Sequence, residues 1–153
     1  MPRLSASELA QYQPNRYPFL MIDVVSDYSP GIFASGYKNL TNNEWFFPEH
    51  FPGHPNMPGA LQLEAMAQML TVAITTIEGL EGSVTHALEH RVRFRREVVP
   101  GDRLDIIATV QSWKRGVCKG TAKCLVDGVP VSDAEMTITI PEILDAHLPV
   151  RNP

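Results

Sequence analysis

The chain has 153 residues, of which 44% are hydrophobic and 20% charged. This composition excludes a wholly disordered or fibrous protein and fits a single domain over residues 1–153. Lys and Arg number 13 and Asp and Glu 17, so the formal charge is −4 and a general nucleic-acid binder is not expected. Proline is in excess, at 13 residues, or about 8% where about 5% is usual.

The N-terminal third predicts short elements separated by loops. Its first residues contain no apolar signal core, so we expect a cytoplasmic protein. The Ser5–Glu8 pattern is typical of a capping box and predicts a short helix over about residues 7–11. An apolar strand is expected after residue 18 and another over residues 32–39. Residues 42–59 are rich in Pro, Gly, Asn and aromatic side chains, which predicts an ordered loop.

Residues 60–78 predict one long helix, because they contain no proline and place apolar side chains on nearly every face. Such a helix is buried rather than amphipathic. It also holds Gln62, Glu64 and Gln68, which argue against a membrane span. Gly79 and Gly82 are the expected helix end.

Three or four antiparallel strands are expected after the helix, over residues 87–98, 104–110, 117–126 and 131–140, with a stop at Pro141. The two cysteines, Cys118 and Cys124, lie about 20 Å apart along one of them. We therefore expect two buried thiols and no disulfide. The element order predicts an α+β fold with the sheet curled around the helix. Because one sheet covers the helix on one side only, we expect at least a dimer.

Three groups around the start of the long helix suit acid–base chemistry. His50 lies between aromatic residues and prolines, and histidine is the usual general base near neutral pH. Burial disfavours the charged form of a carboxyl group, which suits Glu64 to the role of general acid. Gly59 opens the helix with a backbone N–H that can donate to a developing oxyanion. Together they suit removal of a proton next to a carbonyl and loss of a β-hydroxyl as water.

Spacing alone leaves structural interpretations of these residues open. A carboxylate near a helix start more often stabilises the helix dipole, and a single loop histidine is more often structural. His50 and His54 have the i, i+4 spacing of metal ligands, but Pro52 and Gly53 prevent the helix that would place them on one face. No metal is therefore expected.

Longer strings of residues make the assignment more specific. They are NRYPFLMID at 15–23, HFPGHPNMPG at 50–59, LEAMAQ at 63–68, RFRR at 93–96 and VVPGD at 98–102. Together they resemble the 3-hydroxyacyl-acyl carrier protein dehydratases of the FabZ type, in register from about residue 13 to residue 140. The resemblance implies a hotdog fold, no cofactor, and homodimers, three of which can assemble into a hexamer.

The resemblance also implies an active site at the dimer interface, with His50 of one subunit facing Glu64 of the other. The Gly59 N–H would bind the thioester carbonyl, and the Asn56 carbonyl would orient the histidine. Glu at position 64 is typical of the branch that only dehydrates. Apolar walls for the acyl chain are expected from four residues: Phe51, Met57, Leu61 and Met66.

The implied reaction is the reversible dehydration of a 3-hydroxyacyl thioester, carried on acyl carrier protein, to the trans-2-enoyl thioester in fatty-acid or related acyl-chain biosynthesis. Acyl carrier proteins are acidic, so docking requires a basic patch. The candidates are Arg91, Arg93, Arg95, Arg96, Lys114 and Arg115.

Two other functions are alternatives: a hotdog acyl thioesterase and a non-catalytic acyl-binding homologue. Asn15, Glu49 and Glu97 depart from the family's usual residues, which leaves room for a pathway-specific acyl substrate.

Overall fold

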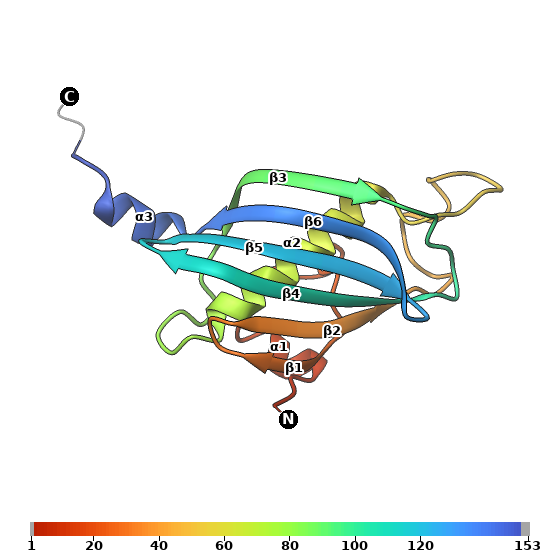
Figure 1. The fold of residues 1–153 in the computed structure, drawn as a ribbon. Helices are drawn as coiled ribbons and strands as arrows, with labels where there is room; N and C mark the ends of the chain where they lie inside the picture. The colour runs from red at the N-terminus through yellow and green to blue at the C-terminus, as the bar shows by residue number, and fades with distance from the viewer. Residues whose placement is uncertain (1, 151–153) are drawn as a thin grey trace.

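The computed structural model describes residues 2–150, which form a six-stranded antiparallel sheet and three helices. In chain order the elements are α1 (Ala6–Leu9), β1 (Val24–Ser29), β2 (Phe33–Asn39), α2 (Gly59–Thr75), β3 (His86–Phe94), β4 (Arg103–Lys114), β5 (Val117–Val126), β6 (Val129–Thr139) and α3 (Pro141–His147). The strand order is β1-β2-β4-β5-β6-β3, so β1 and β3 are the edges. The long helix α2 crosses one face of this sheet, which confirms the α+β arrangement (Figure 1).

α2 packs closely on the sheet because β5 carries a glycine beneath it. A Cβ atom at Gly120 would lie 2.6 Å from Leu70 Cδ1 and 2.7 Å from the Thr109 carbonyl oxygen, so no larger residue fits there without a shift. Burying a leucine side chain of this kind contributes about 1.5–3 kcal/mol. Within residues 2–150, no helix has both the length and the apolar composition needed to cross a bilayer.

The two halves of α2 are buried to different extents. Every residue over 68–75 is buried, and other segments of the same chain contact this half. The Gln13 side chain donates to the Gln68 carbonyl oxygen at 3.2 Å, and the Gly31 N–H donates to the Ala73 carbonyl oxygen at 2.8 Å. In the first half, four side chains are only half-buried: Leu61, Leu63, Glu64 and Ala67. All-round burial, as expected from the sequence, therefore holds for the second half alone.

Several element boundaries differ from the sequence-based expectation, and β4, for example, runs to Lys114 rather than to residue 110. α2 ends at Thr75 rather than near residue 78, and the Thr76 hydroxyl there donates to the Val72 carbonyl oxygen at 2.9 Å. β3 ends at Phe94, before residue 98. Pro141 ends β6 and also begins α3, because proline is well tolerated in the first helical turn, where no N–H partner is needed.

Both cysteines are free and buried, as the strand assignment predicts. Burial raises the pKa of the Cys118 thiol from 9.0 to about 12. It also raises the pKa of the Cys124 thiol from 9.0 to about 12. Both thiols are therefore neutral core side chains at physiological pH.

Candidate active site

The loop that carries His50 is attached to the rest of the molecule at both ends. Near its start, Lys38 of β2 pairs with Glu44 at 2.9 Å, and both side chains are largely buried. Phe47 then enters the core. Near its end, the Met57 N–H donates to the Val98 carbonyl oxygen at 2.7 Å. Residues 51–55 between these anchors are exposed, and the loop extends beyond the end of the sheet (Figure 1).

The His50 ring is held by a backbone carbonyl. Its Nδ1 lies 2.9 Å from the Asn56 carbonyl oxygen. A carbonyl oxygen only accepts hydrogen bonds, so Nδ1 carries the proton and the Nε2 lone pair of the neutral ring is free. The backbone supports the same turn, because the Asn56 N–H donates to the His50 carbonyl oxygen at 2.9 Å. This arrangement leaves Nε2 able to accept a proton.

Glu64 is held by Gln68, one turn further along α2. The Gln68 Nε2 donates to Glu64 Oε1 at 3.0 Å and to the Phe19 carbonyl oxygen at 2.8 Å. The Gln68 Oε1 accepts the Met21 N–H at 2.7 Å, which fixes the orientation of the amide. Because Gln68 occupies one carboxyl oxygen, the other oxygen of Glu64 is the position available for a transferable proton.

Gly59 begins α2, and its lack of a side chain has a clear steric reason. A Cβ atom there would lie 2.7 Å from Cζ of Phe94, whose ring therefore rests directly on the helix start. Within residues 2–150, no hydrogen-bond acceptor meets the Gly59 N–H. The N–H lies at the positive end of a 17-residue helix, where a developing negative charge is stabilised.

A hollow of about 440 Å³ lies beside Gly59. It is lined by Asn56, Met57, Gly59, Gln62, Phe94, Arg95, Arg96 and Glu97. Of the four predicted wall residues, only Met57 lines it, and Met66 lies in the core. Phe51 is exposed at the loop tip and lines a different hollow, and Leu61 is half-buried on α2.

The six predicted docking residues lie in different parts of the sheet. Arg95 and Arg96 lie at the hollow beside Gly59. Arg91 and Arg93 lie on β3 in register with the acidic residues of β6. The turn of Lys114 and Arg115 joins β4 to β5 at the opposite end of the sheet, beside α3 (Figure 1). A single chain therefore brings only part of the predicted patch to the candidate site.

His50 and Glu64 do not meet within one chain. Among residues 2–150, no hydrogen bond or ion pair joins them; His50 contacts Asn56, whereas Glu64 contacts Gln68. Glu49 is exposed, and among residues 2–150 it forms no ion pair with His50. Within residues 2–150 the two catalytic candidates are therefore not joined by a polar contact.

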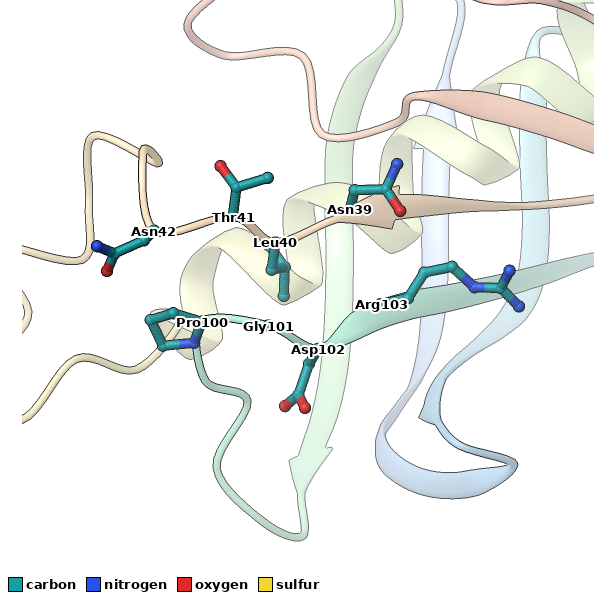
Figure 2. A pocket seen from close by; sticks show the side chains of 8 residues that line it. All are labelled: Asn39, Leu40, Thr41, Asn42, Pro100, Gly101, Asp102 and Arg103. Atoms are coloured by element: carbon teal, nitrogen blue, oxygen red, sulfur yellow. The ribbon is translucent and has the colours of Figure 1, made fainter.

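A second hollow, of about 490 Å³, lies where β2 ends and β4 begins (Figure 2). Two of its lining residues are joined in the turn by hydrogen bonds. The Leu40 N–H donates to the Asp102 carbonyl oxygen at 3.0 Å, and the Asp102 carboxylate accepts the Val99 N–H at 3.0 Å. No predicted site residue lines this hollow, so its polar groups serve the turn.

Sequence reasoning missed the roles of Gln68 and of the Lys38–Glu44 pair. Gln68 belongs to the LEAMAQ string, and its i+4 spacing from Glu64 places both side chains on one helix face. That spacing was available as a signal. The contacts of Gln68 with Phe19 and Met21 could not be predicted from spacing, because nearly fifty residues separate the two segments.

Comparison with known proteins agrees with this geometry. A family model described as a FabA-like domain matches residues 13–135. A 3-hydroxyacyl-[acyl-carrier-protein] dehydratase FabZ from Clostridium botulinum is 42% identical, over 90% of this chain and 99% of that protein. The solved dehydratase heterocomplex ApeI:P from Xenorhabdus doucetiae has a TM-score of 0.77 at 17% identity, over 91% of this chain and 95% of that one.

A more distant fold neighbour is named as a member of a different enzyme class. A hypothetical thioesterase protein with coenzyme A from Streptococcus pneumoniae has a TM-score of 0.55 at 13% identity, over 76% of this chain and 83% of that one. This likeness shows the fold alone.

The sheet packed on one long helix is a hotdog fold. The chain belongs to the FabA-like family, among the FabZ-type 3-hydroxyacyl-acyl carrier protein dehydratases. It is thus an enzyme of the dehydratase class, a carbon–oxygen lyase.

Proposed function

We propose that the chain converts a 3-hydroxyacyl thioester on acyl carrier protein to the trans-2-enoyl thioester, in fatty-acid or related acyl-chain biosynthesis. The observation that carries this proposal is the His50–Asn56 contact of 2.9 Å, which leaves Nε2 as a free base. The identity of 42% to a FabZ dehydratase over 90% of the chain supports the substrate class.

In the proposed reaction, His50 Nε2 removes a proton from C2 of the substrate. The electron pair of that C–H bond forms the C2=C3 double bond, and the C3–O bond breaks. Glu64 gives its proton to the departing hydroxyl, which leaves as water. The Gly59 N–H donates to the thioester carbonyl oxygen, where negative charge develops. A proton then passes from His50 back to Glu64 through solvent, which restores both groups.

The proposed working unit is a homodimer in which His50 of one subunit serves Glu64 of the other. The half-buried first half of α2, which holds Glu64, supports this arrangement. So does β3, because it is a sheet edge with β6 on one side only, and an open edge favours pairing with another chain. Assembly of three such dimers into a hexamer is a further expectation, which the mass of the native particle tests.

Docking of the acidic carrier protein is proposed at Arg95 and Arg96, because they line the same hollow as Gly59. The Arg95 guanidinium pairs with Asp133 at 2.7 Å, which leaves Arg96 as the more available cation. Arg91, Arg93, Lys114 and Arg115 remain candidates for the outer part of the patch.

Cross-complementation tests the shared site. His50→Ala and Glu64→Gln are each expected to lose turnover of a 3-hydroxyacyl thioester, measured by enoyl-thioester absorbance. After co-expression, a mixed dimer contains one intact site and one doubly altered site. Random pairing then restores about a quarter of wild-type activity. A site confined to one chain would give no recovery, because no chain in the mixture carries both groups.

The thioesterase alternative rests on the fold likeness to the pneumococcal protein. It predicts release of free thiol from an acyl thioester that lacks the 3-hydroxyl group. A dehydratase gives enoyl absorbance and no free thiol, so a thiol-specific dye separates the two reactions. Binding of acyl thioesters without either product would instead support the non-catalytic alternative.

A further inference from the structure

Gln62, in the first turn of α2, has an unusual hydrogen-bonding state. The residue is 3% exposed, and its Nε2 donates to the Met57 carbonyl oxygen at 3.3 Å. Its Oε1 is buried and has no partner among residues 2–150. The opposite orientation of the amide would place two oxygens against each other, so Oε1 is the unpartnered atom. Leaving such an acceptor unsatisfied is costly, and a donor from outside the chain would therefore be favoured there.

This oxygen belongs to a residue of the hollow beside Gly59. The same hollow combines the Gly59 N–H, apolar surface from Met57 and Phe94, and the cations Arg95 and Arg96. Arg96 forms no ion pair within residues 2–150. Glu97 also lines the hollow, and its carboxylate pairs with His54 at 2.8 Å. The hollow thus offers an oxyanion donor, an unused acceptor and one cation, Arg96, that is unpaired among the described residues, a combination that suits an elongated ligand with an amide and an anionic end.

We propose that Gln62 Oε1 accepts a hydrogen bond from the first amide N–H of the substrate's phosphopantetheine arm, which makes Gln62 a specificity-determining residue for the carrier side of the substrate. The inference rests on the proposed function, because it takes the thioester carbonyl to lie at Gly59. The terminal torsion of a glutamine is soft, so a small rotation turns Oε1 toward the hollow.

The spacing along α2 supports this assignment. Gln62 follows Gly59 by three residues, which is roughly 4.5 Å along the helix axis. In a pantetheine thioester, four bonds separate the carbonyl carbon from the first amide nitrogen, a comparable span. The phosphate at the far end of the arm suits the rim of Arg95 and Arg96. A hydroxyl group on the acyl chain is the rival donor, but it would lie away from these cations.

Two substrates that differ in one atom test the proposal. The first is a 3-hydroxybutanoyl thioester of N-acetylcysteamine, and the second carries an ester oxygen in place of the amide N–H. Wild-type protein is expected to prefer the amide by about fivefold in kcat/KM, the effect of one neutral hydrogen bond. In Gln62→Met, a variant of similar length, the ratio is expected to fall to about one. Gln62→Leu provides a second variant if the methionine variant does not fold.

The ratio of the two substrates separates recognition from a structural role. If Gln62 only supports the Met57 carbonyl, both substrates lose rate equally and the ratio persists, which overturns the proposal. A wild-type ratio near one also overturns it and favours a donor on the acyl chain. Gln11→Leu, at an exposed position outside the site, is the matched control and should leave the ratio unchanged.

The same pair of substrates distinguishes this proposal from the proposed function. If wild-type protein converts neither thioester, the dehydratase assignment for such substrates fails. The Gln62 contact is then still tested by calorimetric dissociation constants of the two corresponding unreactive thioethers. A difference present in wild type and lost in Gln62→Met supports the contact, and equal affinities contradict it.

Discussion

The two halves of α2 have nearly the same apolar composition but different surroundings. Over residues 68–75 every side chain is buried by the sheet and by other segments of the same chain. Over residues 59–67 one face is half-buried, and this face carries Glu64. One continuous helix therefore has two roles. Its second half completes the core of a single chain, and its first half presents the candidate acid on a surface that another copy can cover.

Replacing Glu64 with Gln should have the largest effect on activity. The amide keeps the shape and can still accept from Gln68, but it has no acidic proton to give. Loss of a general acid lowers kcat by about 10²–10⁴-fold, whereas the melting temperature should change little. Steady-state kinetics and thermal unfolding check both parts. The control is Glu78→Gln, at an exposed position after α2, which should keep wild-type activity. Equal losses in the two variants would contradict the role of Glu64.

Leu70→Ala should have the largest effect on stability, because Leu70 packs on Gly120 in the fully buried half. Truncation of a buried leucine costs about 2–5 kcal/mol, measured by chemical denaturation at fixed protein concentration. Leu63→Ala is the matched change in the half-buried half. Its cost should be smaller and should depend on protein concentration, because in the proposed homodimer a second copy covers that face. A large, concentration-independent cost at Leu63 would contradict the difference between the two halves.

The smallest expected effect at physiological pH concerns Cys118 and Cys124, two buried residues of β5. Their pKa values are raised from 9.0 to about 12, so the folded state binds the thiol protons more tightly than the unfolded state does. Below pH 9 both states are protonated and stability is unaffected. Between pH 9 and about pH 12 only the unfolded thiols ionise, so stability falls as pH rises.

A thiol reagent at pH 8 checks the same burial directly. Both cysteines should react only after denaturant is added. Rapid reaction of the native protein would show that the sheet opens readily on this side.

Local patterns were sufficient for most of the fold. Alternating apolar residues predicted the strands after α2, and the absence of proline predicted the helix itself. The sequence did not predict α3, because a proline such as Pro141 can stop a strand and also start a helix. The early end of α2 at Thr75 also had only a weak local signal. His50 and Gly59 were predicted from their local setting and Asn56 from the family resemblance, and the contact of His50 with Asn56 agrees with the latter.

By itself, the sequence determined the α+β fold, the long helix, and a candidate base, acid and oxyanion donor, because periodicity and short motifs are properties of neighbouring residues. Only the tertiary structure decided that Gln68 orients Glu64 and that half of α2 remains partly open. It alone separated Lys114 and Arg115 from Arg95 and Arg96, and left Gln62 with an unpartnered oxygen. These features depend on strand register and on contacts between segments far apart in the chain, which no local pattern specifies.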